Sequence, residues 1–91
     1  MEYLDLATSR LLMQLGMYIS PFVWAGQEQT IHPWDALKFL LTKFGTLVSL
    51  LAATNGQCSA SCVPFGWFYG ATEAEAVAKL VKDIAEREGV A

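Results

Sequence analysis

The chain has 91 residues, of which 54% are hydrophobic and 16% are charged, and its formal net charge is −3. This composition excludes a disordered tail, and the length allows one domain, residues 1–91. The weakly negative charge supplies no basic surface for a phosphate backbone, so we expect no nucleic-acid partner.

Large apolar residues are more numerous than a core of this size can hold. Folding of so short a chain buries only about 60 to 65% of its surface, so many apolar side chains should stay outside the core of a monomer. Such a surplus favours contact with other copies of the chain, with a hydrophobic partner or with a membrane. We therefore expect a homodimer or a larger oligomer.

The cellular compartment is indicated by the first residues and by the cysteines. The start of the chain lacks both a positively charged region and an uninterrupted apolar run, so we expect no targeting segment. Cys58 and Cys62 are too few for a secreted disulfide framework, and a four-residue spacing within one regular element is poor disulfide geometry. The sequence therefore predicts reduced thiols in a cytoplasmic protein.

The first third of the chain has a helical pattern. Apolar residues recur at steps of three or four and predict a helix from Tyr3 to Ile19. Ser20 and Pro21 then fit an N-cap followed by a first helical proline, which predicts a short helical turn over 22–25. The polar run over 26–30 predicts a surface connection.

The run from Ala36 to Ala53 is apolar on nearly every side and predicts the central helix of the fold. We expect this helix to begin at Pro33, a residue pre-set for the first helical position, and to end at Thr54. Asn55 and Gly56 would supply its stop, because both residue types tolerate the left-handed conformation that ends helices.

From Gln57 to Gly70 the residues become small and aromatic. Two short strands, Ser59 to Val63 and Trp67 to Tyr69, can pair as a hairpin across the intervening proline and glycine. An aromatic Ω-like loop fits the same composition, and the pattern does not separate the two.

The last segment carries a capping box, in which the Thr72 hydroxyl accepts a first-turn amide and the Glu75 carboxylate reaches back to the N–H of Thr72. An apolar stripe follows, so we predict an amphipathic helix from Glu73 to Glu88. The run from Gly70 to Ala76 is similar to the strand-to-helix junction of the HicB-type antitoxin domain and of many unrelated small α+β proteins. Capping explains this likeness, and we infer no function from it.

Together these elements predict a mainly α, three-helix domain, with a short extra helical turn and a possible small β-hairpin before the last helix. The two outer helices should pack against the central apolar helix. Part of its apolar surface, together with the aromatic segment, should remain for a neighbouring subunit.

Residues that could carry chemistry are sparse. His32, with Asp35 three residues later, would need a nearby nucleophile to act as a general base, and its place before a helix-starting proline favours a capping role. Cys58 and Cys62 together with His32 give three metal ligands, whereas structural zinc sites use four with closer pair spacing. We expect no metal, no cofactor and no enzymatic activity.

The leading functional hypothesis is a non-enzymatic oligomeric interaction protein, an adaptor or inhibitor that presents an apolar and aromatic patch to another protein. The predicted partner-binding residues are Phe39, Phe44, Leu47, Leu50, Phe65, Trp67, Phe68 and Tyr69.

Two alternatives stay open. In the first, a small ligand binds between subunits in an aromatic pocket, and a cationic side chain meets an anionic group. Its predicted residues are Trp24, Trp34, Trp67 and Tyr69, with Arg10 or Lys38 as the cation. In the second, the protein associates with a membrane, which Lys38 and Lys43 inside the predicted central helix disfavour.

Overall fold

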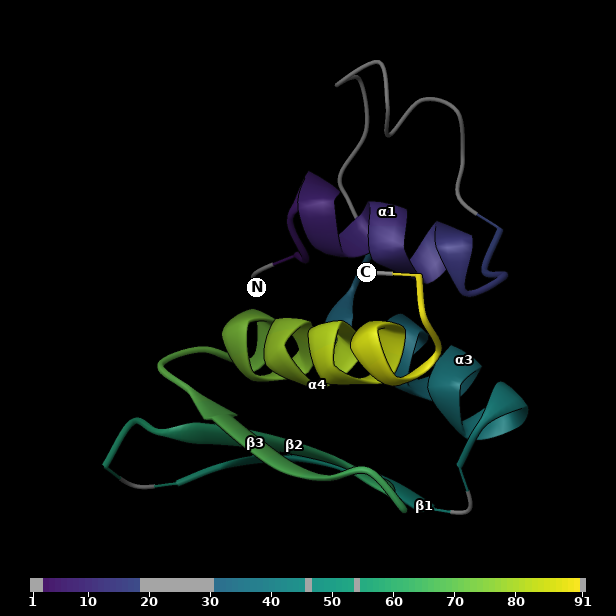
Figure 1. Ribbon diagram of the computed structural model, residues 1–91. Coiled ribbons are helices and arrows are strands. Elements are labelled where there is room, and N and C mark those ends of the chain that lie inside the picture. The colour runs from purple at the N-terminus through teal and green to yellow at the C-terminus, as the bar shows by residue number, and fades with distance from the viewer. Residues whose placement is uncertain (1–2, 19–30, 46, 54, 91) are drawn as a thin grey trace.

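In the computed structural model, which describes residues 3–18, 31–45, 47–53 and 55–90, helices lie on one side of a three-stranded antiparallel sheet (Figure 1). The elements in chain order are α1 (Leu6–Gln14), α3 (Pro33–Lys43), β1 (Leu47–Ala52), β2 (Cys58–Val63), β3 (Gly66–Gly70) and α4 (Glu73–Arg87). The strands lie in the order β1-β2-β3. Helix α4 lies across β2 and β3, α3 lies beside β1, and α1 packs on α4 on the side away from the sheet.

The prediction of a mainly α fold is wrong, because the expected central helix is a helix followed by a strand. Helix α3 ends at Lys43, Phe44 is its C-cap, and the chain continues as β1. A short apolar run has no periodicity that separates a buried strand from a helix, and pairing with β2 decides between them. The architecture is therefore α+β.

The predicted helix stop at Asn55 and Gly56 is instead the turn between β1 and β2. The N–H of Ala53 donates to the Gln57 carbonyl at 2.8 Å, and Gly56 has a φ of +86°. The Asn55 side chain accepts the N–H of Gln57 at 3.0 Å. The same residues that can end a helix therefore close a hairpin, as Asn-Gly often does.

The second hairpin, which the sequence left open against an irregular loop, is present. Strands β2 and β3 pair antiparallel, with Ser59 opposite Tyr69 and Ser61 opposite Trp67. Its turn contains Pro64 and Phe65.

Helix α1 is shorter than predicted at both ends. The Asp5 carboxylate accepts the N–H of Thr8 at 2.8 Å, which places the N-cap two residues after the predicted start at Tyr3. Gly16, with a φ of +112°, follows the C-cap residue and turns the chain away. The predicted end at Ile19, the helical turn over 22–25 and the connection over 26–30 lie outside the described residues.

The starts of α3 and α4 are confirmed, because both depend on local caps. His32 Nδ1 accepts the N–H of Trp34 at 3.1 Å, which is the capping role expected for it. Thr72 Oγ1 accepts the N–H of Glu75 at 3.1 Å, while the Glu75 carboxylate accepts the N–H of Ala71 at 3.3 Å instead of that of Thr72. Helix α4 ends at Arg87, one residue before the predicted end.

The core lies between the covered face of the sheet and α4, and extends between α4, α1 and α3. Its largest fully buried side chains include Leu4, Leu12, Leu37, Leu40, Val77, Leu80, Val81 and Ile84. On the sheet side the central strand contributes the small residues Ala60 and Cys62, so α4 can approach β2 closely. One face of the sheet is thereby filled.

Candidate functional site: the open face of the sheet

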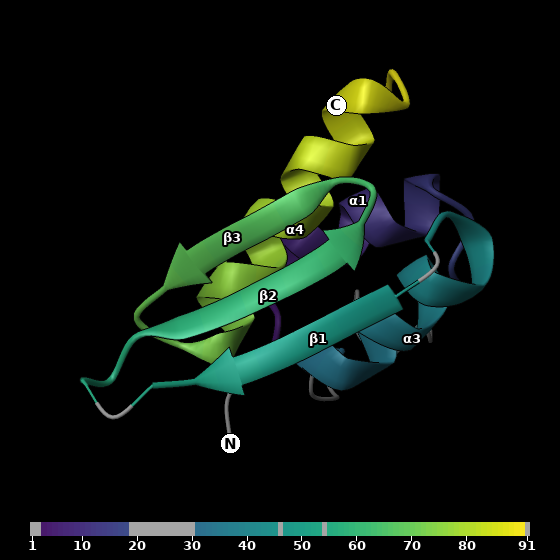
Figure 2. The same ribbon diagram turned by 90° about the horizontal axis from the view of Figure 1, so that it is seen from below.

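The opposite face of the sheet, here called the open face, is covered by no described element and is turned toward the viewer in Figure 2. Because side chains alternate along a strand, every second residue of each strand belongs to this face. The open face consists of Leu47, Ser49 and Leu51 on β1, Ser59, Ser61 and Val63 on β2, and Trp67 and Tyr69 on β3.

The register puts large side chains at the edges of the open face and small ones at its centre. Across the sheet, Ser61 lies between Ser49 and Trp67, and Ser59 lies between Leu51 and Tyr69. We call Trp67 and Tyr69 the aromatic edge. The opposite margin, Leu47 and Leu51, is called the aliphatic edge.

The large side chains of the open face are about half exposed in the single chain. The exposed fraction is 63% for Leu47, 55% for Leu51, 45% for Val63, 53% for Trp67 and 51% for Tyr69. Single exposed apolar residues are normal on a protein surface, whereas a contiguous group of them marks an interaction site.

The polar groups of the open face are uncharged and partly satisfied. The Ser49 and Ser61 hydroxyl oxygens lie 2.7 Å apart and share a hydrogen bond. A hydroxyl oxygen has two lone pairs, so each serine keeps acceptor capacity for a further donor. Ser61 is only 6% exposed, so Ser49, which is partly exposed, is the serine that can accept an N–H from an approaching molecule.

Charge is absent from this whole part of the chain. No Asp, Glu, Lys, Arg or His occurs from Phe44 to Thr72, a span that includes all three strands and both hairpin turns. Helices α1, α3 and α4, which carry charged residues, lie on the other side of the sheet (Figure 2), and one of these residues, Lys79, reaches the Tyr69 carbonyl at the sheet edge. The molecule thus has a charged helical side and a neutral apolar sheet face.

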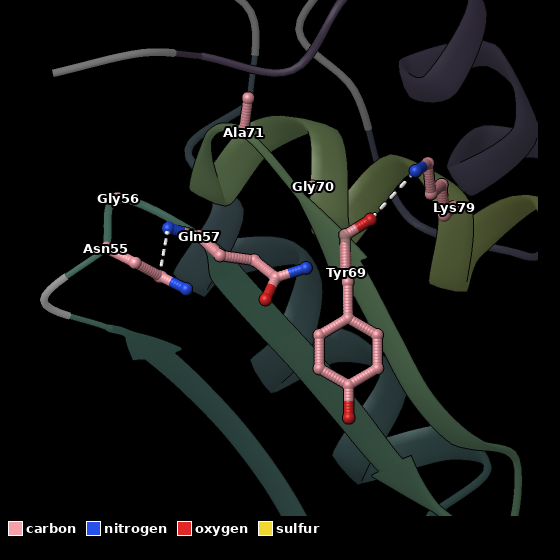
Figure 3. Close-up of a pocket in the computed structure, with 7 residues that line it drawn as sticks. All are labelled: Asn55, Gly56, Gln57, Tyr69, Gly70, Ala71 and Lys79. Atoms are coloured by element: carbon pink, nitrogen blue, oxygen red, sulfur yellow. Dashed lines mark hydrogen bonds between the residues drawn. The ribbon is translucent and has the colours of Figure 1, made fainter.

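A polar hollow of about 560 Å³ lies at one end of the sheet, beside the β1–β2 turn (Figure 3). Its cation, Lys79, donates to the Tyr69 carbonyl at 2.8 Å and lies 3.5 Å from the Glu75 carboxylate. Both side chains are about half exposed, so water screens them. Because these two acceptors already engage the ammonium group, the hollow is poorly suited to hold an anion.

A second hollow, of about 310 Å³, lies beside the first and shares Gln57 and Tyr69 with it. Leu51 and Tyr69 form its walls, and Ser59 lies between them. The hollow therefore belongs to the open face, where it provides room for a side chain of a bound molecule.

The structure divides the predicted partner-binding residues between three places. Leu47, Trp67 and Tyr69 lie together on the open face. Leu50 and Phe68 alternate with them and lie on the covered face, where Leu50 is buried and Phe68 packs against the core.

The other three predicted residues, all phenylalanines, are partly buried against the core. Phe44 and Phe65 make an edge-to-face contact with ring centroids 6.2 Å apart, and the Arg87 guanidinium lies 5.6 Å from the centre of the Phe65 ring. Phe39 lies on α3, with the Lys43 ammonium 6.0 Å from its ring centre. Phe44 and Phe65 thus connect the end of α3 with the β2–β3 turn within one chain.

Leu51 and Val63 also belong to the open face, although neither was among the predicted partner-binding residues. Leu51 was assigned to a helix, and Val63 has no partner-binding signal by itself. The signal that finds both is the two-residue alternation of β1 and β2, which becomes readable once the strands are recognised.

The predicted ligand-binding residues are not brought together within one chain. Trp34 and Lys38 are exposed one turn apart on α3, and Arg10 is exposed on α1. Trp67 and Tyr69 belong to the open face, and Figure 2 shows α1 and α3 behind the sheet as seen from that face. Trp24 lies outside the described residues.

The two thiols are free and face the covered side of β2. They lie four residues apart on one strand, which corresponds to about 13 Å. Burial raises the pKa of the Cys62 thiol above its ordinary value. Within the described ranges no three His, Cys, Asp or Glu residues gather closely enough to hold a metal ion.

Among the described helices, none is both long enough and apolar enough to cross a bilayer. The run that suggested such a helix is divided between α3 and β1.

Comparisons with protein-family models, with curated proteins and with solved structures gave no match.

Proposed function

We propose that this protein is a small, non-enzymatic, cytoplasmic interaction protein, an adaptor or inhibitor that binds another protein through its open face. The observation that supports this proposal is the set of five half-exposed apolar side chains on one face without charge. At about 100 Å² for each half-exposed large side chain, the set offers about 500 Å² in total, distributed over the two edges and Val63 with serines between them.

The residue types favour a protein as the bound molecule. Trp and Tyr present large contact areas with few rotatable bonds and are enriched among the residues that dominate binding energy. A lipid surface or a nucleic acid would instead favour several lysine and arginine residues around the aromatic residues. The three strands contain none, and one cation, Lys79, lies at the edge of the sheet on the Tyr69 carbonyl.

Site-specific photocrosslinking in the source cells tests this proposal. A benzophenone amino acid at Tyr69 samples the open face, and the same amino acid at Lys82, exposed on α4, is the matched control. We expect a defined adduct with another protein from position 69 and none from position 82.

The protein found in this way must also bind the purified chain. We expect Trp67→Ala to weaken that binding at least about tenfold, or about 1.4 kcal/mol, because tryptophan is enriched among the residues whose truncation costs the most binding energy. Equal adducts from both positions, or no adduct with any protein other than the chain itself, would refute the proposal.

A further inference from the structure

We infer that the open face is self-complementary, and that a second copy of this chain covers it whenever the partner protein is absent. In this dimer the aliphatic edge of each copy lies on the aromatic edge of the other. The inference rests on the proposed function, since it takes the open face as the interaction surface, and it adds a specific occupant.

The area available is enough for a second copy. Each face offers about 500 Å² of apolar side chain, so two faces together bury about 1,000 Å², which is the lower limit for a specific protein interface. Ser49 and Ser59, which are partly exposed, add to this area. A face of this size therefore fits a weak dimer that exchanges with its monomers.

The two edges differ in a way that a two-fold axis can use. An axis parallel to β2 lays β1 of one copy over β3 of the other, so that every contact occurs twice. Trp67 then faces Ser49 of the other copy, and Tyr69 faces Leu51. A large side chain meets a smaller one at both positions, as close packing between two sheets requires.

The polar groups of the face are also compatible with this contact. The indole N–H of Trp67 needs an acceptor when it is buried. Ser49 lies opposite it in the dimer, and its hydroxyl oxygen keeps acceptor capacity beside its hydrogen bond with Ser61.

Charge does not oppose the contact, although each chain carries a net charge of −3. The charged side chains belong to the helices behind each sheet, and two stacked sheets already lie about 10 Å apart. This separation exceeds the Debye length of about 8 Å at physiological salt. The neutral faces can therefore meet while the charged sides stay in water.

Self-association and partner binding would use the same side chains and exclude each other. The dimer is then the resting form, and the partner must displace the second copy to reach Trp67 and Tyr69. A rise in chain concentration should weaken apparent partner binding, since more of the face is occupied by the chain itself.

The first test is light scattering of the purified full chain across a concentration series. We expect the mass to rise from that of one chain, 10.0 kDa, toward twice that value. Trp67→Ala should shift the midpoint of the monomer–dimer transition at least about tenfold to higher chain concentration, whereas Lys82→Glu on α4 should leave that midpoint unchanged. A single chain that stays monomeric at about 500 µM overturns the inference.

The second test fixes the arrangement with charges. Leu51→Lys alone and Tyr69→Glu alone should each be monomeric, because either buries an unpaired charge twice in the dimer. Mixed in equal amounts they should form a heterodimer, since Lys at 51 then faces Glu at 69. Circular dichroism of each variant verifies that the fold is retained.

A control pair discriminates the other possible axis. If the axis were perpendicular to the strands, β1 would lie over β1, and Leu51→Lys would pair with Leu47→Glu instead. Preference for that pair overturns the proposed arrangement, as does association of either single variant at the wild-type level.

Saturable binding to neutral phosphatidylcholine vesicles, lost with Trp67→Ala, would show a lipid occupant and overturn the inference.

The two proposals fail separately. A monomer that still crosslinks a defined protein from position 69 removes the second copy and keeps the proposed function. A dimer that crosslinks only itself keeps the second copy and removes the adaptor or inhibitor role.

Discussion

The break between α3 and β1 can be tested by adding one methyl group at Gly45. A Cβ at this position would lie 2.6 Å from Cys62 Sγ and 3.0 Å from the Val63 carbonyl oxygen. Both contacts are shorter than relaxed packing allows, and the carbonyl belongs to the backbone of β2 and cannot rotate away. Gly45→Ala therefore tests whether the chain passes this closely against the sheet.

The sign of the effect separates the two possible structures of this region. In the middle of a continuous helix from Pro33 to Thr54, Gly45→Ala would stabilise the protein by about 1 kcal/mol. In the observed structure the clash costs about 1 to 3 kcal/mol. The lower entropy of the unfolded chain with alanine offsets up to about 1 kcal/mol of this cost, so the net loss lies between about 0 and 3 kcal/mol and is opposite in sign to the gain in a continuous helix.

The assay is equilibrium unfolding in urea at one fixed, low chain concentration, because association would otherwise add to the measured stability. Thermal unfolding should agree, with a lower Tm by about 4 to 8 °C for each kcal/mol. An unchanged slope of the unfolding free energy against urea concentration verifies that unfolding exposes the same amount of surface in both proteins.

A double-mutant cycle with Cys62→Ala locates the clash. Without Sγ the nearest atom to the new methyl group is the Val63 carbonyl oxygen, so the effect of Gly45→Ala should shrink by about 1 kcal/mol or more without vanishing. An unchanged effect in the Cys62→Ala background would refute the packing argument. A stabilising Gly45→Ala would refute the break itself.

Three further outcomes can be checked with the same instruments. Lys43→Met removes the ammonium donor to the Leu15 carbonyl, so it should lower the free energy of unfolding by about 1 kcal/mol and speed amide hydrogen exchange at the end of α1. Amide exchange as slow as in the wild type would contradict a stabilising role for this hydrogen bond. Thr72→Ala removes the N-cap of α4 and should cost about 1 kcal/mol, whereas Thr72→Ser should cost less than half as much; similar losses would contradict a capping role. Since burial raises the pKa of Cys62 above 9.0, the folded chain keeps a proton that the unfolded chain loses, so stability should fall as pH rises above about 9; Cys62→Ala should flatten this fall, and an equal slope in both proteins would contradict the assignment.

Local signals in the sequence were sufficient for α4 and for the start of α3. Thr72 and His32 accept amides within three residues of themselves, so no distant partner is needed to place these helix starts. The position of β1 could not be obtained in the same way, because its pairing partners on β2 are distant and its run of apolar residues also fits a helix. Gly45 and the Asn55-Gly56 pair can interrupt regular structure, but Gly45 also fits inside a helix and Asn55-Gly56 also fits the end of one.

The sequence predicted which residue types would be available for contact, but it did not predict which of them would share one face of the sheet. The sequence indicated that aromatic residues near Trp67 would be available for contact, and the structure exposes Trp67 and Tyr69 about halfway. It could not assign Phe68 and Leu50 to the covered face, because a shift of one residue in register exchanges the two faces of a strand. The open face depends on the register of all three strands, which only long-range pairing determines.

The exposed apolar side chains that the composition predicts lie mostly on the open face and are not spread evenly over the surface. Four of the five most exposed large apolar side chains in the described part of the chain belong to the open face: Leu47, Leu51, Trp67 and Tyr69. Because two such faces bury only about 1,000 Å², a self-contact of this size lies with transient interfaces, while permanent homodimers commonly bury about 2,000 Å² or more. An interface of this area allows another protein to displace the second copy, because a larger interface would make the dimer too stable for such displacement.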